Sequence, residues 1–442
     1  MAILRIPYES LEKPGAYLEL EVPDKNLKAK IIPQEPGGIQ DLSVAVEKAV
    51  EAPVDGPKFS ELVRNGKRVT FITENQFRQA PARDILPVLI EKGRQAGSEM
   101  SIIIGNATLP PLSSEELEKK LGAELIKSGI PIFFNDVNDF GQYRYIGITK
   151  AGTPLFVHKV VADADIIVTI STTQATAWGY GGSGMIIPAV TSSETTELNH
   201  LLSLAPDCTP GNNDCLMQHD KYEALELANA QMGINVIVSN QGRVIFVNAG
   251  SPVKSNKEAI HFYNQIYQFS LDELIQEKVD IAITGSTAHT DDLFFHTGWA
   301  LGNCEPIVRD KGIIIMATPC KGYGDWPGFA RMDVLKSYLP PSKEKQAQAV
   351  LDFYRQTVSG QKSFAWYKIY EVMARKEVWI VTEKKNLSVC EEIGLTVYES
   401  VEKAFNQALK KKGANARLAF IPYGRYTLLK PKGVKIKPYS VK

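Results

Sequence analysis

Three of the six histidines lie in segments that we expect to border a ligand site. They are His200, His289 and His296. A neutral imidazole can bind a metal ion or transfer a proton near neutral pH. His289 and His296 are seven residues apart, so both can lie on one face of a helix. The alternative is that all three are hydrogen-bonded structural histidines.

An arginine occupies the junction between a predicted buried strand, residues 67–73, and a predicted helix, residues 81–97. This residue is Arg78. Its guanidinium can donate two parallel hydrogen bonds, which suits a carboxylate or a phosphate. A structural ion pair is the alternative role.

A glycine-rich segment, residues 178–184, follows a second predicted buried strand, residues 165–171. Small residues between a strand and a helix leave backbone N–H groups free to bind an anion. Tight turns are also rich in glycine, and that alternative stays open. The residues we expect to contact a phosphate are Gly181, Gly182, Ser183 and Gly184.

The helix after this segment is predicted from a capping box. Thr191 and Glu194 have the spacing in which two side chains satisfy the first N–H groups of a helix. The helix would carry Asn199 and His200 at its far end.

Strand-like and helix-like segments alternate along most of the chain. This pattern predicts an α/β fold of two domains, each with a mainly parallel sheet flanked by helices. We place the first domain at residues 1–254, joined by the tail 415–442, and the second at residues 255–414. The second begins with a long helix predicted over residues 255–276. A cleft between the two domains is the expected site for a small ligand.

The composition argues against several classes of protein. The chain has 442 residues, with 50 basic and 50 acidic side chains. This balance indicates no excess of basic residues, which argues against nucleic acid as the main partner. The chain contains no apolar run long enough to span a membrane and no signal peptide, which favours a cytoplasmic protein. The five cysteines lack metal-binding or redox spacing, so we expect reduced thiols. Pairing of Cys208 with Cys215 and formation of a homo-oligomer are left open.

These segments, in this order, resemble the nickel-dependent lactate racemase family, which comprises 2-hydroxyacid racemases and epimerases. Arg78 and Pro81 match one family segment, and residues 109–117 match a second. The glycine-rich segment, Asn199-His200 and residues 249–253 follow in register. The resemblance implies a small carboxylate or hydroxyacid as substrate and a nickel-pincer nucleotide as cofactor.

The resemblance also implies roles for single residues. Arg78 matches the arginine that orients the substrate carboxylate, and His200 matches the histidine that ligates nickel. Gly184 falls where the family has the lysine that links the cofactor. Leu109 and Gln174 fall where the family has its two acid/base histidines.

Two further positions of the family fall in the second domain. A family glutamine and lysine match His296 and Trp299. We therefore predict catalytic roles for His296, His289 and Gln174, and substrate binding by Arg78 and Trp299.

Because several positions differ from the family's functional residues, three functions stay open. The first is racemase or epimerase activity on a small 2-hydroxyacid other than lactate. The second is carboxylate binding without catalysis. The third is a lyase or dehydratase reaction that would use His289, His296 and Asp291.

Overall fold

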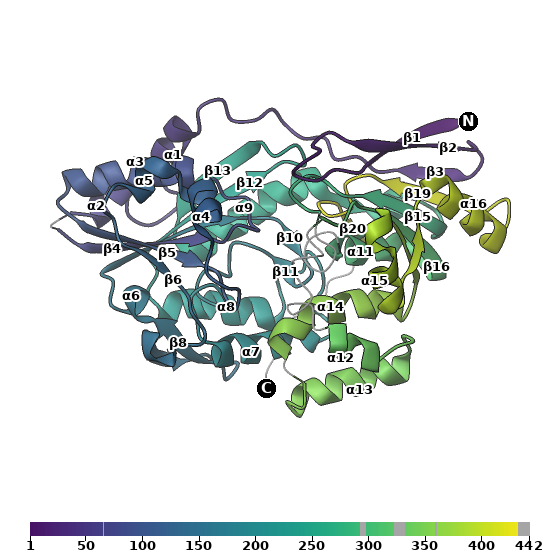
Figure 1. Ribbon diagram of the computed structural model, residues 1–442. Coiled ribbons are helices and arrows are strands. Elements are labelled where there is room, and N and C mark those ends of the chain that lie inside the picture. Colours follow the sequence, from purple (N-terminus) through teal and green to yellow (C-terminus); the bar gives the residue numbers. More distant parts are fainter. Residues whose placement is uncertain (65, 292–297, 322–331, 359, 432–442) are drawn as a thin grey trace. The chain divides into compact units, whose positions relative to one another are not determined.

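The computed structural model describes residues 1–64, 66–291, 298–321, 332–358 and 360–431. The chain divides into two compact units. One unit comprises residues 35–208 and 212–265, and the other comprises residues 1–34, 209–211 and 266–437. We refer to them as the 35–265 unit and the terminal unit. Figure 1 shows the ribbon coloured along the chain.

The 35–265 unit is built on a six-stranded sheet in the order β13-β12-β9-β4-β5-β6. Its strands are parallel except β13, which pairs antiparallel with β12. The strands are β4 (Arg68–Glu74), β5 (Glu99–Gly105), β6 (Ile132–Phe134), β9 (Ile166–Thr172), β12 (Met232–Val238) and β13 (Val244–Gly250).

The strand order reverses between β4 and β9. The chain runs from β4 outward to β5 and β6, and then returns to place β9 on the other side of β4. At such a point the loops after the two strands diverge, which opens a crevice beyond their carboxyl ends. The loop after β4 contains Arg78, and the loop after β9 contains Gln174 and the glycine-rich segment.

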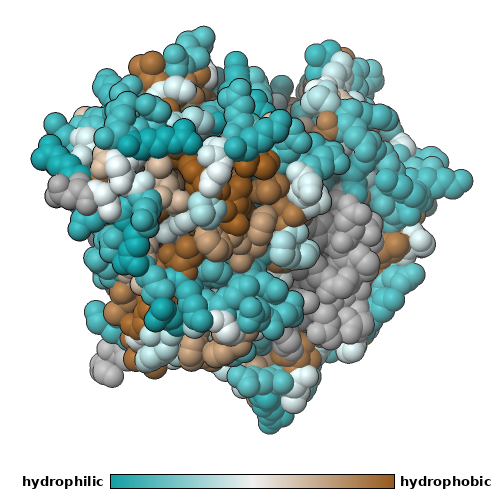
Figure 2. All heavy atoms as spheres, turned by 60° about the vertical axis from the view of Figure 1, so that its left-hand side comes forward, coloured by the Kyte–Doolittle hydropathy of each residue, from teal (hydrophilic) through white to brown (hydrophobic). Residues whose placement is uncertain are grey.

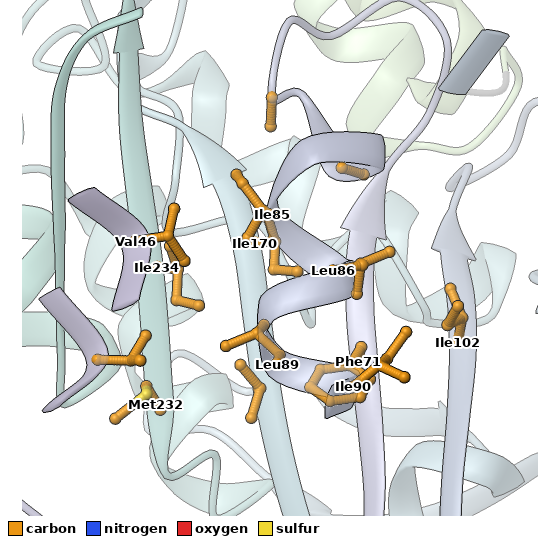
Figure 3. Close-up of a cluster of buried hydrophobic side chains, with 14 of the residues drawn as sticks. Val46, Phe71, Ile85, Leu86, Leu89, Ile90, Ile102, Ile170, Met232 and Ile234 are labelled. Carbon is orange, nitrogen blue, oxygen red and sulfur yellow. The ribbon is translucent and has the colours of Figure 1, made fainter. Parts of the chain in front are cut away.

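One face of this sheet is covered by α1 (Leu42–Glu51) and α3 (Ala82–Gln95). Ile85, Leu89 and Ile90 recur at helical spacing on α3 and are buried. Figure 3 shows them against side chains of the sheet such as Phe71 and Ile170.

The opposite face is covered by a second set of elements. The elements that pack there, together with residues 185–190, are β8 (Pro154–His158), α6 (Lys159–Ala162) and α8 (Leu216–Leu227). Strand β8 pairs with β7 (Tyr143–Ile148). The remaining elements of the unit are α2 (Phe59–Leu62), α4 (Ser114–Leu121), α5 (Ala123–Ile126), η1 (Phe140–Gln142), β10 (Ala175–Thr176), β11 (Gly179–Tyr180), α7 (Ser193–Leu201), η2 (Leu202–Leu204) and α9 (Pro252–Tyr267). The last two residues of α9 belong to the terminal unit.

The terminal unit contains a second six-stranded sheet, in the order β18-β17-β16-β15-β19-β3, with every pairing parallel. A hairpin of β1 (Ala2–Pro7) and β2 (Tyr17–Val22) shares a hydrophobic core with α16 (Val401–Lys412) and this sheet. The strands are β3 (Leu27–Lys30), β15 (Val279–Gly285), β16 (Val308–Ala317), β17 (Glu377–Val381), β18 (Thr396–Tyr398) and β19 (Leu418–Ile421).

Shorter elements complete the terminal unit. A two-stranded parallel sheet joins β14 to β20. The elements are β14 (Gln268–Ser270), α10 (Leu271–Leu274), α11 (Trp299–Cys304), η4 (Glu305–Ile307), α12 (Met332–Ser337), α13 (Lys343–Tyr354), α14 (Gly360–Met373), η6 (Lys384–Asn386), α15 (Leu387–Glu392) and β20 (Leu428–Lys430).

The two-domain α/β fold is as predicted, but the boundaries differ from 1–254 and 255–414. Residues 1–34 belong to the terminal unit because β3 pairs with β19, and β19 pairs with β15. The tail around β19 therefore also lies in that unit. These pairings join segments far apart in the sequence, which local periodicity does not reveal.

Two predicted helices begin or end elsewhere. The helix predicted over 255–276 is α9, which ends at Tyr267 and is followed by the short strand β14. The helix predicted after the glycine-rich segment starts one residue later than the capping box implied. Ser192, rather than Thr191, caps α7, because its side chain accepts the N–H of Thr195.

The surface carries scattered hydrophobic residues. Figure 2 shows one face, on which polar residues predominate and hydrophobic ones gather in a few places. In the part of the chain that the structure describes, no helix has the length and hydropathy needed to cross a membrane.

The α3 core gives a first prediction. Leu89→Ala should lower the free energy of unfolding by about 2–5 kcal/mol, because it leaves a cavity between α3 and the sheet. Urea denaturation followed by circular dichroism measures the change. Val44→Ala, on the exposed side of α1, is the control and should change it by less than about 0.5 kcal/mol. Equal effects of the two substitutions would contradict the packing described.

Candidate functional site

The carboxylate of Glu74 fixes the carboxyl ends of β4 and β9. Its Oε1 accepts the backbone N–H of Thr172 at 2.7 Å, and its Oε2 accepts the Thr172 hydroxyl at 2.8 Å. Oε2 also accepts the N–H of Ala80 at 3.2 Å. One buried side chain therefore holds both loops of the strand-order reversal.

Lys120 fixes the Arg78 loop from its other side. Its ammonium, on α4, donates to the carbonyl of Ala80 at 2.9 Å and to that of Arg78 at 3.3 Å. Burial lowers the pKa of Lys120 to about 8, while Glu74 opposes the shift. The backbone beside Arg78 is thus held by charged groups buried within the fold.

Arg78 is half-buried at this position. Burial lowers the pKa of its guanidinium, and the nearby Glu74 carboxylate partly offsets that effect. A guanidinium stays protonated at neutral pH even so. Arg78 therefore supplies a positive charge to the loop after β4.

The loop after β9 is a small hairpin. β10 pairs antiparallel with β11, and Gly181 donates its N–H to the carbonyl of Gln174 at 2.9 Å. A Cβ on Gly182, whose φ is +94°, would lie 2.1 Å from the Asn256 amide nitrogen. Close packing within the protein therefore accounts for these two glycines.

Helix α8 supports this hairpin through Gln218. The Gln218 amide donates to the carbonyls of Trp178 and Tyr180, and its oxygen accepts the Ser183 hydroxyl at 2.8 Å. All three contacts are buried. Gly184 differs from Gly181 and Gly182, because a Cβ at position 184 would make only ordinary contacts, at 3.4 Å or more.

His200 lies in the last turn of α7, as predicted. Its Nδ1 is 2.8 Å from the carbonyl oxygen of Thr196, and its ring meets that of Trp178 edge-on at a centroid distance of 5.6 Å. Burial, with a further contribution from the Lys221 charge, lowers the pKa of His200 to about 4. The imidazole is therefore neutral at pH 7, and because the Thr196 carbonyl can only accept a hydrogen bond, the proton lies on Nδ1 and Nε2 is the unprotonated nitrogen.

The end of α7 is joined to α8 by Asn199 and Asp220. The Asn199 amide donates to Asp220 Oδ2 at 2.8 Å. The same carboxylate accepts the hydroxyls of Thr149 and Thr153. This network fixes His200 relative to α8.

Sequence reasoning did not single out Glu74, Lys120, Gln218 or Lys221. Lys221 follows Gln218 by three positions on α8 and is buried. A lysine on the apolar side of a helix was the signal that could have found it. The other three became recognisable only through contacts between distant segments.

Other sequence-predicted residues have different surroundings. Gln174 is buried in the hairpin, and Leu109, which follows β5, is also buried. His289 lies in the terminal unit and is exposed. Trp299 begins α11 in the same unit, is buried, and has the Arg425 guanidinium carbon 4.8 Å from its ring centroid. His296 lies outside the described residues.

Asp291 has a structural role within the terminal unit. Its Oδ1 accepts the Thr318 hydroxyl at 2.5 Å and the Cys320 N–H at 2.7 Å, and its Oδ2 accepts the Lys321 N–H at 3.1 Å. This carboxylate holds the loop after β16.

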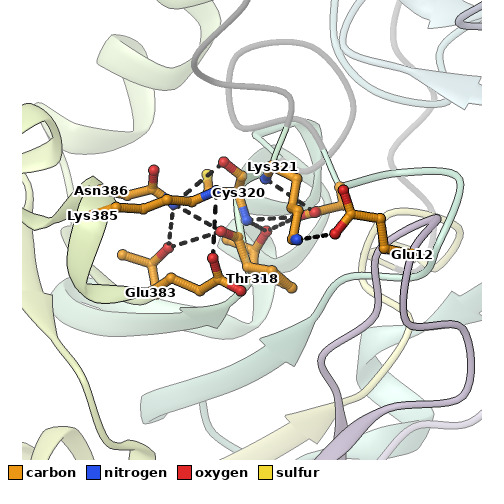
Figure 4. A network of polar contacts seen from close by, with 10 residues as sticks. Glu12, Thr318, Cys320, Lys321, Glu383, Lys385 and Asn386 are labelled. Carbon is orange, nitrogen blue, oxygen red and sulfur yellow. Dashed lines mark hydrogen bonds and ion pairs between the residues drawn. The ribbon is translucent and has the colours of Figure 1, made fainter.

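The same loop is held from its other side by Asn386, whose amide donates to the carbonyl of Pro319 at 2.8 Å. Figure 4 shows Thr318, Cys320, Lys321 and Asn386 in this network. The contacts account for Asp291 without a catalytic role.

None of the five cysteines forms a disulfide, and Cys208 and Cys215 are therefore not paired with each other. Among the described residues, no group of three or more His, Cys, Asp or Glu side chains has a metal-binding arrangement.

Family models match most of the chain. The model of the lactate racemase N-terminal domain matches residues 15–209, and that of the C-terminal domain matches residues 274–428. The chain belongs to the lactate racemase family. This confirms the resemblance seen in the sequence.

Individual relatives match over nearly the full length. The lactate racemases of Lactiplantibacillus plantarum and Thermoanaerobacterium thermosaccharolyticum are each 21% identical to the chain. These matches cover 97% and 98% of this chain, respectively, and 100% of each relative.

Solved structures share the fold. The lactate racemase apoprotein from T. thermosaccharolyticum has a TM-score of 0.83 at 21% identity and covers 97% of this chain and 100% of its own. A protein from Thermotoga maritima has a TM-score of 0.66 at 15% identity, with 90% of this chain and 100% of its own covered.

The family uses a nickel cofactor, and the residues present fit it only in part. The buried, oriented imidazole of His200 suits a metal ligand. Gly184 has no amine to form a covalent link, although its surroundings would accept a Cβ. The site therefore does not fit a cofactor tethered at this position.

The hairpin gives a second prediction. Gln218→Leu should destabilise the protein by about 1–3 kcal/mol, since buried partners lose their hydrogen bonds. Hydrogen exchange should also rise in residues 178–183. Thermal unfolding and exchange mass spectrometry measure both effects. Gln95→Leu, on an exposed turn of α3, is the matched control, and unchanged exchange in Gln218→Leu would refute the bracing role.

Proposed function

We propose that this protein is a racemase- or epimerase-class enzyme that acts on a small 2-hydroxyacid other than lactate. The observation that supports this most is the presence of both Arg78 and His200 in the 35–265 unit, each held by buried contacts of its own segment. Family membership supplies the reaction class. The change of substrate is inferred from the residues at positions 109, 174 and 184.

Arg78 is proposed to bind the substrate carboxylate. Its charge lies on the loop after β4, at the strand-order reversal where small ligands bind in sheets of this kind. The two N–H groups of the guanidinium bind both carboxylate oxygens and so orient the carbon whose configuration is inverted.

His200 is proposed to provide a neutral imidazole nitrogen for a metal or cofactor. Hydride transfer needs a group other than a side chain to accept the hydride, and the family's nickel cofactor supplies it when bound. Because Gly184 offers no attachment point, such a group would be held without a covalent bond there. Gly181, Gly182 and Ser183 are proposed as its neighbours.

Acid/base roles for Gln174, His289 and His296 stay predictions, as does substrate binding by Trp299. Gln174 has an amide without a useful pKa, so its role would be a hydrogen bond rather than proton transfer. Whether His289, His296 and Trp299 share one ligand site with Arg78 also stays a prediction.

Carboxylate binding without catalysis is a second candidate. Leucine at position 109, glutamine at 174 and glycine at 184 favour it, since none can perform the chemistry that the family has at those positions. It predicts binding of a hydroxyacid with no interconversion of its two enantiomers. A lyase or dehydratase reaction has less support, because the Asp291 carboxylate is occupied by the loop after β16.

The role of Arg78 gives a third prediction. Arg78→Ala should lower kcat/KM for the interconverted hydroxyacid roughly 10- to 100-fold, because that is the loss expected when a hydrogen bond to a charged group is removed. Chiral chromatography of a panel of D- and L-2-hydroxyacids identifies the substrate and measures the rate. Arg83→Ala, in an exposed pair with Asp84, is the matched control and should behave as the wild type. Full activity in a folded Arg78→Ala variant would exclude this role.

The role of His200 gives a fourth prediction. His200→Ala should abolish enantiomer interconversion, because the only buried imidazole of α7 is lost. The same chromatographic assay applies, with circular dichroism to confirm folding. His219→Ala removes a half-exposed histidine on α8 and should leave the rate unchanged. If His200→Ala and His219→Ala interconvert the enantiomers at the same rate, the proposed function is wrong.

A further inference from the structure

Lys221 is unusual among the buried lysines of this protein. Three lysines are buried in the described part of the chain: Lys120, Lys221 and Lys376. Lys120 donates to two carbonyls, and Lys376 pairs with Asp310 at 2.7 Å. Among the described residues, the Lys221 ammonium has neither a hydrogen bond nor an ion pair, although its side chain is only 6% exposed.

Helix geometry places Lys221 on the side of α8 that faces the hairpin. Gln218 and Met217 precede it by three and four positions, so the three side chains share one face. Gln218 contacts the carbonyls of Trp178 and Tyr180. Met217 sulfur lies 3.9 Å from the Cys208 sulfur. Lys221 therefore lies on the face of α8 that contacts the hairpin and Cys208, and it is buried there.

The charged groups around Lys221 do not neutralise it. The adjacent Asp220 carboxylate is engaged by Thr149, Thr153 and Asn199. Burial of that carboxyl raises its pKa, which further weakens it as a counter-ion.

The other groups within electrostatic range of Lys221 are the Cys208 and Cys215 thiols, His200 and Arg78. Arg78 adds positive charge, and His200 is neutral at pH 7. The two thiols are buried and form no disulfide; burial lowers the pKa of Lys221, and the two cysteines only partly oppose that effect. A buried cation in such surroundings is costly unless an anion joins it.

We propose that Lys221 binds an anionic oxygen group of a ligand, a carboxylate or a phosphate, next to Arg78 and His200. The inference rests on the proposed function, because it assigns a second cation to the same ligand site. Two cations with one neutral imidazole suit a ligand with more negative charge than a simple hydroxyacid carries. Either a second carboxylate on the substrate or the phosphate of a bound nucleotide would provide it.

Calorimetric titration of the full chain tests the inference. The probes are inorganic phosphate and, separately, hydroxymalonate, a 2-hydroxyacid with two carboxylates. The wild type should bind at least one of them, and Lys221→Met should weaken that binding at least tenfold. Lys221→Arg keeps the charge and should retain most of the affinity. Binding of phosphate alone points to a nucleotide, and binding of hydroxymalonate alone points to the substrate; binding of both supports an anion site open to either group.

Thermal unfolding separates a ligand contact from a structural role. Without ligand, Lys221→Met should unfold at the same temperature as the wild type or higher, because it removes a buried charge that lacks a partner. A lower unfolding temperature would show that the lysine supports the fold and would overturn the inference. So would binding of neither anion to the wild type, or equal binding to the wild type and Lys221→Met.

The result is distinct from a failure of the proposed function. Binding is measured without turnover, so an anion site that depends on Lys221 can exist in a protein that interconverts no hydroxyacid. In that case the reaction class alone is rejected. Conversely, interconversion that depends on Arg78 and His200, with anion affinity insensitive to Lys221, rejects this inference alone.

Discussion

The buried carboxylate of Glu74 is the contact on which the candidate site depends. It bonds to the end of β9 and to Ala80, just before α3, and so joins the two loops that leave the sheet where the strand order reverses. Lys120 then fixes the carbonyls of the Arg78 loop. These bonds lie in a region of low dielectric, where satisfied polar networks define one arrangement. Arg78 can therefore hold a position without belonging to a helix or strand.

A second set of contacts fixes the other half of the site. Gln218 braces the hairpin of β10 and β11, and Asp220 anchors the end of α7 through Asn199. Both residues come from α8, which packs on the sheet with a hydrophobic side. The helix thus sets the position of His200 and carries Lys221 among the same groups. The chemistry proposed for this unit arises from one sheet edge and one supporting helix.

The sequence predicted the parts of this arrangement that local patterns encode. Apolar runs located β4 and β9. An arginine between a predicted strand and a predicted helix indicated that Arg78 could bind a carboxylate. The end of α7 carried His200 as expected. The pattern did not reveal that Gly181 and Gly182 pack against protein atoms, because glycine spacing alone does not distinguish a turn from an anion cradle. Nor did it place residues 1–34, since the pairing of β3 with β19 joins opposite ends of the chain. Glu74 and Lys221 acquire their meaning only from contacts with distant segments.

Position 184 of this member of the lactate racemase family is a glycine, which has no side-chain group for a covalent link, and we propose that any cofactor is held there without a covalent tether. Mass spectrometry tests it most directly, on protein produced together with the enzymes that make the nickel cofactor. The account predicts that the denatured chain has its unmodified mass, and that any nickel-containing adduct is seen only under native conditions. A nucleotide adduct that survives denaturation would contradict the account.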